Sequence, residues 1–91
     1  MKFYTYILYS STADKFYIGF TGDEILERLR KHNTNHAGFT GKFNDWQVMY
    51  HEIYETKKAA MNREKEIKGW KSKNKIISLI NSSAGLAHSD L

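Results

Sequence analysis

The sequence predicts a single small α+β domain, in which a three-stranded antiparallel sheet is flanked by helices in the order β-β-α-β-α-α. Two short runs rich in aromatic and β-branched residues, at 3–9 and 16–20, are separated by a polar, turn-like segment. A third such run occupies 47–54, and the segments after the second and third runs space their apolar residues as helices do. The 91 residues suffice for one domain. We assign residues 1–81 to it and 82–91 to a C-terminal tail.

The first two runs are expected to pair as a hairpin, because the connection between them is short and polar. Neighbouring side chains of a strand point to opposite faces of the sheet. Tyr6 therefore faces away from Ile7, and Tyr17 shares its face with Gly19 while Ile18 lies on the other side. The hairpin thus brings two tyrosines onto adjacent strands.

A helix is expected after the hairpin and should fade near Asn33. Thr21 and Glu24 fit a capping box, with Asp23 as the alternative N-cap. The apolar stripe that would bury this helix consists of Ile25, Leu26 and Leu29.

The polar segment 33–46 is long for a connection in a small domain. It carries three aromatic residues, Phe39, Phe43 and Trp46. These side chains either pin the loop to the core, which we favour, or stack on unpaired nucleic-acid bases.

Two helices are predicted after the third strand. Thr56 is a suitable N-cap for a long helix that reaches about Trp70, and a shorter helix covers roughly 73–81. The composition of the last ten residues favours no particular structure.

The charge pattern is compatible with a nucleic-acid partner. The net charge is +4, and eight of the fourteen lysines and arginines lie between Lys57 and Lys75. A local basic stripe is typical of a surface that binds phosphates, although a solvated helix surface gives the same pattern. The absence of cysteine excludes a disulfide framework and a thiolate metal site. No signal peptide or membrane span is evident, so we expect a cytoplasmic protein without a membrane partner.

Ionisable side chains border the apolar stripes of two predicted helices. Arg28 and His32 are four residues apart and share one helix face, where each has an ordinary explanation as a boundary residue. Glu64 lies on the stripe of the long helix. A carboxylate there needs a cation, a hydrogen-bond donor or a metal, and a simple helix pair with Lys68 is the alternative to a functional role.

These side chains and the two tyrosines of the hairpin lie within four short sequence segments. Residues 4–9 (YTYILY), 16–21 (FYIGFT), 28–33 (RLRKHN) and 60–70 (AMNREKEIKGW) resemble the GIY-YIG nuclease family, in particular its small standalone bacterial members. The first block departs from the family pattern, because Tyr4-Thr5-Tyr6 replaces Gly-Ile-Tyr and keeps only the final tyrosine. The nearest match to a late asparagine of the family is Asn74.

The resemblance implies an endonuclease that hydrolyses DNA phosphodiester bonds with Mg²⁺ (or Mn²⁺). Glu64 would hold the metal, Tyr17 would position or deprotonate the attacking water, and Tyr6 would hydrogen-bond the water or the phosphate. Arg28 would neutralise charge on the phosphate, and His32 would relay a proton or contact the phosphate.

Further DNA contacts are expected from the basic stripe. The candidates are Lys65, Lys68, Lys71, Lys73, Asn74 and Lys75. Phosphate contacts carry no sequence information, so we expect weak sequence preference, as suits a role in DNA repair or recombination. Two alternatives remain, a nucleic-acid-binding module without catalysis and a protein-interaction domain.

Overall fold

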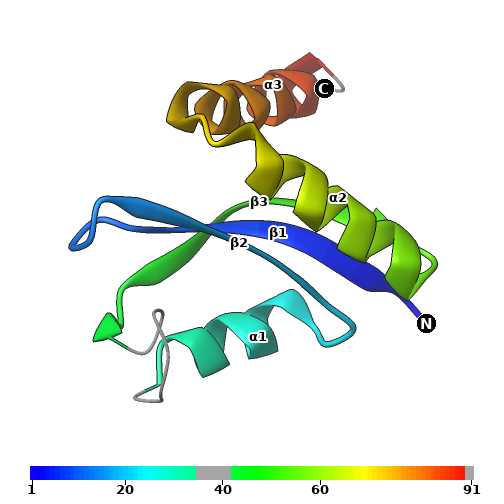
Figure 1. The fold of residues 1–91 in the computed structure, drawn as a ribbon, viewed down its shortest axis with the longest axis horizontal. Coiled ribbons are helices and arrows are strands. Elements are labelled where there is room, and N and C mark those ends of the chain that lie inside the picture. The colour runs from blue at the N-terminus through cyan, green and yellow to red at the C-terminus, as the bar shows by residue number, and fades with distance from the viewer. Residues whose placement is uncertain (35–41, 90–91) are drawn as a thin grey trace.

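The computed structural model describes residues 1–34 and 42–89, with side chains described up to residue 82. Its elements are β1 (Phe3–Ser10), β2 (Lys15–Thr21), α1 (Ile25–His32), β3 (Trp46–Tyr54), α2 (Lys57–Trp70) and α3 (Lys73–Ser89). The strands form one antiparallel sheet in the order β2-β1-β3. Helix α1 covers one face, whereas α2 and α3 lie on the other side (Figure 1). The predicted fold class and element order are confirmed.

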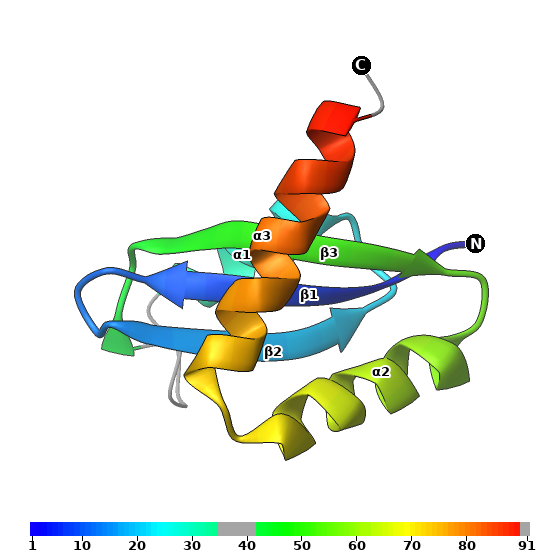
Figure 2. The same cartoon turned by 90° about the horizontal axis from the view of Figure 1, so that it is seen from above.

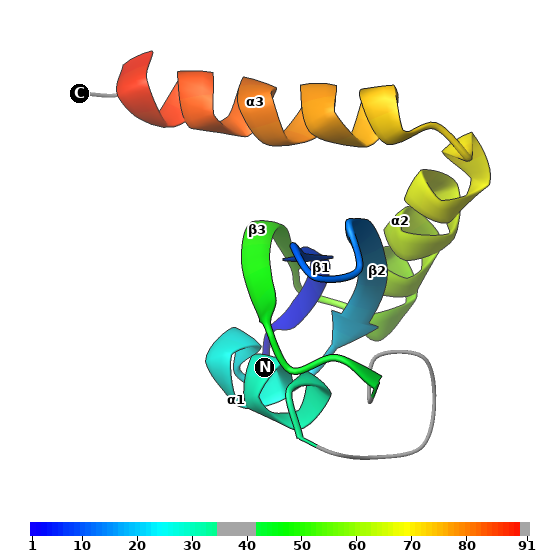
Figure 3. The ribbon, with the colours of Figure 1, turned by 90° about the vertical axis from the view of Figure 1, so that its left-hand side faces the viewer.

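The two later helices have different positions on their side of the sheet. Helix α2 runs along the β2 edge, and α3 crosses above the strands (Figures 2 and 3). Between them the backbone turns at Lys71, which caps α2 in the left-handed region with φ of 49°. This turn separates the helix that carries Glu64 from the helix that closes the core.

The side chains of the central strand β1 point alternately to the two faces of the sheet, as predicted. Tyr6 pairs with Gly19 of β2 and Ile7 pairs with Ile18. Ile7 is completely buried on the side of α2 and α3, in the cluster Ile7, Ile18, Ile67 and Ile76. Tyr6 is 2% exposed and belongs to the cluster on the α1 side, Tyr6, Leu8 and Trp46. Two small cores therefore share one sheet.

The predicted caps of α1 are wrong. Thr21 is the last residue of β2, where it pairs with Tyr4, and its hydroxyl accepts a hydrogen bond from the Asp23 amide two residues later. That local turn uses the hydroxyl that a helix cap needs. The N-cap is Glu24, whose side chain makes no capping hydrogen bond, and α1 begins one residue later.

The two C-terminal helices follow the prediction more closely. Thr56 caps α2 as predicted, because its hydroxyl accepts from the amide of Ala59. Helix α3 begins at Lys73 but continues to Ser89, eight residues beyond the predicted end. Two alanines and a leucine in that stretch favour a helix, and no proline interrupts it, although it also holds a glycine. No helix in the described part of the chain is long and apolar enough to cross a membrane.

The connection between α1 and β3 is closed by one side chain. The Asn33 amide donates to the Trp46 carbonyl oxygen at 3.1 Å, and its oxygen accepts from the Trp46 amide at 2.8 Å. Trp46 is 2% exposed and packs edge-on to Phe43. For Trp46 and Phe43 the predicted pinning to the core is therefore what the structure shows, whereas Phe39 lies outside the described residues.

Candidate active site

The hydroxyl of Tyr6 is the centre of a polar cluster between β1 and α1. It makes a hydrogen bond of 2.9 Å with Nε2 of His32 and accepts a weaker one from Nε of Arg28 at 3.4 Å. Arg28 and His32 reach the same hydroxyl because they are one helical turn apart on the face that α1 turns toward the sheet. Sequence spacing predicted this shared face, and the structure adds the phenol that joins the two side chains.

Gly19 makes room for this phenol. It is the cross-strand partner of Tyr6, and a Cβ atom at this position would come within 2.5 Å of the Tyr6 hydroxyl oxygen and 3.1 Å of the Tyr17 ring. Any larger residue must displace one of the two rings. The Tyr-Ile-Gly sequence of β2 is thus explained by packing: its tyrosine supplies a site residue and its glycine admits another.

Tyr17 lies beside the cluster, in a more open position. Its ring centroid is 4.8 Å from that of His32 and 6.5 Å from that of Tyr6. Tyr17 is half-buried, and its hydroxyl has no hydrogen-bond partner within the described residues. The two tyrosines therefore differ: Tyr6 is a buried anchor, whereas the Tyr17 hydroxyl is free to bind a water molecule.

Glu64 approaches the same site from α2. Its Oε2 is 3.2 Å from the Lys68 ammonium, which lies 5.9 Å from the centroid of the Tyr17 ring. The negative charge of Glu64 also contributes to raising the pKa of Tyr6. Glu64 is thus on the same side of the sheet edge as the two phenols. The helix pair with Lys68, weighed as an alternative, is present and does not move the carboxylate away from them.

The donor set suits a magnesium ion better than a transition metal. The described residues contain no group of three or more histidine, cysteine, aspartate or glutamate side chains that could hold a metal. Mg²⁺ retains several waters and accepts one protein carboxylate together with phosphate oxygens. The Glu64 carboxylate is largely buried, since its side chain is 13% exposed, and Lys68 pairs with one of its oxygens at 3.2 Å. Glu64 therefore fits a hydrated cation.

The pKa values of Tyr6 and Arg28 are both raised, so both side chains keep their protons. Burial raises the pKa of Tyr6, despite the opposing effect of the Arg28 guanidinium, so this phenol stays neutral. The hydrogen bond with Tyr6 raises the pKa of Arg28, which keeps the guanidinium charged. A neutral, buried phenol is a positioning group rather than a base. Arg28 donates only through Nε, which leaves the rest of its guanidinium available for an anion within the described surroundings.

The predicted DNA contacts differ in their surroundings. Lys65 and Lys75 are exposed, Lys68 is paired with Glu64, and Lys73 is paired with Asp14 at 3.1 Å. Lys71 is exposed at the turn between α2 and α3. Asn74 is exposed in the first turn of α3, and no contact among the described residues joins it to the tyrosines or to Glu64. The structure thus brings Tyr6, Tyr17, Arg28, His32 and Glu64 together and leaves Asn74 apart.

Sequence analysis missed an ion-pair network that fixes α2 against β3. Arg63 contacts Glu52 through Nε at 3.0 Å and Nη2 at 3.1 Å, and it also contacts Glu66 at 2.9 Å. The hydroxyls of Tyr50 and Tyr54 donate to the same Glu52 carboxylate. The alternation of residues 50, 52 and 54 on one strand face was the available signal. Because Arg63 precedes Glu64, this network helps to set the rotation of the helix that presents the metal-binding candidate.

Comparison with known proteins identifies the family of the chain. The model of the family described as the GIY-YIG catalytic domain matches residues 2–76, and the chain belongs to that family. GIY-YIG domains are nucleases, which defines the class of the protein.

Within this class the chain is similar to proteins named UPF0213. It is 34% identical over 77 residues to a UPF0213 protein of Haloquadratum walsbyi, covering 82% of this chain and 85% of the relative. It is 34% identical over 73 residues to a UPF0213 protein of Bacillus pumilus, covering 79% and 72%. The solution NMR structure of a UPF0213 protein from Bacillus halodurans matches with a TM-score of 0.53 and 25% identity, covering 89% of this chain and 84% of the other.

Proposed function

We propose that this protein is a magnesium- or manganese-dependent endonuclease that hydrolyses DNA phosphodiester bonds at the cluster of Tyr6, Tyr17, Arg28, His32 and Glu64. The observation that carries the proposal is the convergence of these five side chains from two strands and two helices, with the Glu64 carboxylate as the anionic member. Phosphodiester hydrolysis needs a cation, an oriented water and neutralisation of phosphate charge, and this set contains a candidate for each.

Tyr17 orients the attacking water in this proposal, because it is half-buried beside His32 and its hydroxyl has no other partner within the described residues. His32 packs at a tilt against the Tyr17 ring and is hydrogen-bonded to Tyr6, so it can accept or pass on the proton that the water releases. Tyr6 holds His32 and Arg28 in place from its buried position.

Arg28 and Lys68 act on the phosphate. The free edge of the Arg28 guanidinium suits two non-bridging oxygens, and its raised pKa keeps it charged through the reaction. Lys68 now neutralises Glu64. A cation held by Glu64 would take over this neutralisation, and the Lys68 ammonium, 5.9 Å from the centroid of the Tyr17 ring, would then be available to a phosphate oxygen.

Glu64 would hold the cation through its carboxylate, and a bound Mg²⁺ or Mn²⁺ would polarise the phosphate and stabilise the leaving oxygen. The substrate is recognised through its backbone, because the candidate contacts are lysines and an arginine, which suit phosphates. We therefore propose weak sequence preference and a setting in DNA repair or recombination, where the shape of the DNA marks the substrate.

The test is a cleavage assay with purified protein and Mg²⁺ or Mn²⁺ on duplex, branched and single-stranded DNA. We expect metal-dependent cutting of at least one substrate, and its loss in Glu64→Gln, which keeps the size of the side chain. The matched control is Glu55→Gln, an exposed glutamate between β3 and α2 and outside the cluster, which should cut normally.

Failure to cut any of these substrates contradicts the proposal. Salt-sensitive DNA binding without cutting would then identify a binding module, since phosphate contacts weaken steeply with salt. Salt-insensitive association with a protein partner and no DNA binding would identify an interaction domain instead.

A further inference from the structure

The carboxylate of Glu52, on the α2 side of the sheet, is surrounded by hydrogen-bond donors. It accepts from the hydroxyls of Tyr50 and Tyr54 and from two guanidinium nitrogens of Arg63, at 3.0 and 3.1 Å. The side chains of Glu52 and Arg63 are only 19% and 22% exposed. Burial alone would raise the pKa of Glu52, but the hydrogen bonds from Arg63 and the two tyrosines outweigh it and hold the pKa below its ordinary value, so the pair is ionic.

Arg63 is held on more than one side. Besides its two bonds with Glu52, its Nη1 donates to Glu66 at 2.9 Å, and its guanidinium lies 5.5 Å from the centroid of the Trp70 ring. A planar guanidinium that meets a carboxylate through two nitrogens tolerates little rotation, unlike a contact between aliphatic side chains. The Arg63 side chain therefore fixes the direction that this position of α2 faces.

A second contact with α2 comes from the strand next to Glu52. Thr5 of β1 is the cross-strand partner of Glu52, and its hydroxyl donates to the Ala60 carbonyl oxygen of α2 at 2.7 Å. Thr5 is 1% exposed, and Ala60 is completely buried. Ala60 and Arg63 are three residues apart, so one turn of α2 is tied to one cross-strand pair of the sheet.

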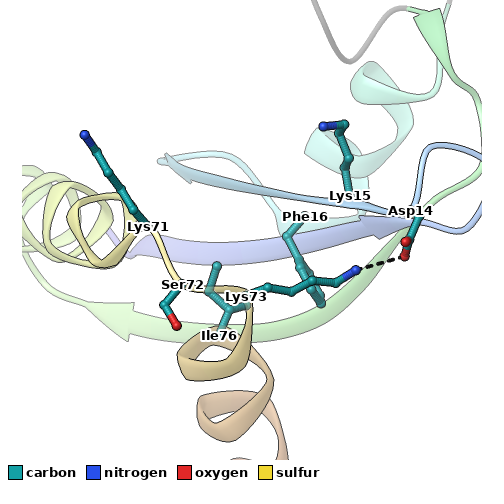
Figure 4. A pocket seen from close by; sticks show the side chains of 7 residues that line it. All are labelled: Asp14, Lys15, Phe16, Lys71, Ser72, Lys73 and Ile76. Atoms are coloured by element: carbon teal, nitrogen blue, oxygen red, sulfur yellow. Dashed lines mark hydrogen bonds and ion pairs between the residues drawn. The ribbon is translucent and has the colours of Figure 1, made fainter.

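The far end of α2 is held by an exposed contact. Beyond the α2–α3 turn, Lys73 pairs with Asp14 of the β1–β2 turn at 3.1 Å, beside the open cavity shown in Figure 4. Both side chains are more than half exposed, and ion pairs of this kind contribute little to holding an element in place. The rotation of α2 about its axis therefore depends more on the shielded contacts at Ala60 and Arg63 than on this pair.

Glu64 directly follows Arg63, so the same rotation sets its direction. Consecutive residues of an α-helix point about 100° apart. Arg63 faces Glu52 on β3. Glu64 then points toward β2, where its partner Lys68 lies 5.9 Å from the centroid of the Tyr17 ring. Side chains end about 5–6 Å from the helix axis, so a rotation of about 20° would move the carboxylate by about 2 Å, which is enough to break a metal or phosphate contact.

We propose that Glu52 is a positioning residue, which acts through Arg63 to hold the Glu64 carboxylate at the active-site cluster. The inference rests on the proposed function for the role of Glu64, whereas the position of α2 that it explains can be measured without any reaction. It gives the Glu52–Arg63 pair a task beyond stability. A pair that only stabilised the fold could be replaced by uncharged side chains without any effect on Glu64.

The test variant carries Glu52→Gln together with Arg63→Met. Removing both partners of a shielded ion pair avoids the large cost of leaving one charge unpaired, so the variant should fold with a melting temperature near that of the unchanged protein. The new amide oxygen can still accept from the two tyrosine hydroxyls. Two quantities are measured by NMR: the nuclear Overhauser effects between the Lys68 side chain and the Tyr17 ring without metal, and the affinity for Mn²⁺ from paramagnetic broadening.

We expect the Lys68–Tyr17 effects to weaken in this variant and the Mn²⁺ affinity to fall about 10–100-fold, the usual cost of losing a group that orients a metal ligand. The matched control for charge is Lys2→Met with Glu55→Gln, which removes an exposed ion pair and should change neither quantity. The control for stability is Ile76→Ala, which truncates a buried residue of α3. It should lower the melting temperature and, while the protein is folded, leave both quantities unchanged.

The outcomes separate this inference from the proposed function. Unchanged Lys68–Tyr17 effects in a folded Glu52/Arg63 variant overturn the positioning role, whether or not the protein cuts DNA. An equal loss in Ile76→Ala overturns it as well, because any loosening of the fold would then suffice. If the unchanged protein neither binds Mn²⁺ nor cuts DNA, the proposed function fails, while a selective loss of the Lys68–Tyr17 effects still supports the positioning role. Should the double variant not fold, Arg63→Lys, which keeps the charge but not the planar fork, carries the same test.

Discussion

The two faces of the sheet are built from neighbouring residues of the same strands and have opposite character. Toward α2 and α3, Ile7 and Ile18 pack against Ile67 in a cluster whose fully buried members are all isoleucines. Toward α1, Tyr6 and Tyr17 pack against polar side chains, and the Tyr6 hydroxyl is shared by a histidine and an arginine. The first face gains stability from apolar burial, and its polar contacts, Arg63 with Glu52 and the Thr5 hydroxyl with the Ala60 carbonyl oxygen, fix α2 on the sheet. The second holds buried polar groups that are each satisfied by a partner, which is the pattern expected where chemistry is done.

The difference explains how so small a domain supports a polar site. The strand period of two places a site residue next to each core residue, so the core fixes the backbone that positions the site. Substitutions on the two faces should therefore have separable effects, one on stability and the other on cleavage.

The largest effect is expected from Tyr17→Phe on the polar face. Removing a hydroxyl that orients or deprotonates the attacking water should slow cleavage by about 10²–10⁴-fold. Since that hydroxyl has no hydrogen bond within the described residues, the free energy of unfolding should change by less than about 0.5 kcal/mol. Single-turnover cleavage and urea denaturation measure the two quantities, and normal cleavage by the variant would remove Tyr17 from the mechanism.

Ile67→Ala tests the aliphatic face. Ile67 is completely buried, and truncation should reduce the free energy of unfolding by about 2–5 kcal/mol. At temperatures where the variant remains folded, the cleavage rate should be nearly unchanged. A folded variant with a lost rate would show that the two faces are not separable.

Gly19→Ala tests the polar face for both stability and cleavage, because the added methyl group collides with the Tyr6 phenol. We expect a loss of about 1–3 kcal/mol of stability from overpacking, together with slower cleavage as Tyr6 releases His32 and Arg28. Gly69→Ala is the control, since no atom lies within 4 Å of its added Cβ; an alanine in the α2 helix should stabilise the fold by about 0.5–1 kcal/mol. Equal behaviour of the two variants would contradict the packing explanation.

The smallest expected effect is on the free energy of unfolding at alkaline pH. One tyrosine of each face, Tyr50 and Tyr6, contributes to it. Burial and the Glu52 hydrogen bond raise the pKa of Tyr50 from 10.0 to about 12, and burial also raises that of Tyr6. The folded state thus keeps protons that the unfolded chain loses first. Their contribution to stability is complete below about pH 10 and is lost as the pH rises toward 12. Denaturation across this range should show the decline, and Tyr50→Phe should make it shallower.

Local patterns predicted a large part of this fold and site. The alternation of β1 and β2 set Tyr6 opposite to Ile7 and Tyr17 opposite to Ile18, and helical spacing placed Arg28 beside His32, because both periods are fixed by backbone geometry. The resemblance to GIY-YIG domains added Glu64, whose spacing alone favoured no more than a pair with Lys68.

The remainder depends on contacts between distant segments. The Glu52–Arg63 ion pair joins a strand to a helix, and the two hydrogen bonds between Asn33 and Trp46 close a long connection, so no local pattern marks either. The start of α1 was mispredicted because the Thr21 hydroxyl serves a turn at the end of β2 instead of the helix. Tertiary contacts and competing local hydrogen bonds thus set the limits of prediction here.

The most direct measurement is the location of a bound Mn²⁺ ion by paramagnetic broadening of NMR signals, which needs no substrate and no cleavage. If one ion-binding site joins β1, β2, α1 and α2, substoichiometric Mn²⁺ should broaden signals of Glu64, Tyr17 and Arg28 first, and Glu64→Gln should abolish the effect. Broadening centred elsewhere, or unchanged broadening in Glu64→Gln, would contradict the assignment of this cluster as the metal-dependent active site.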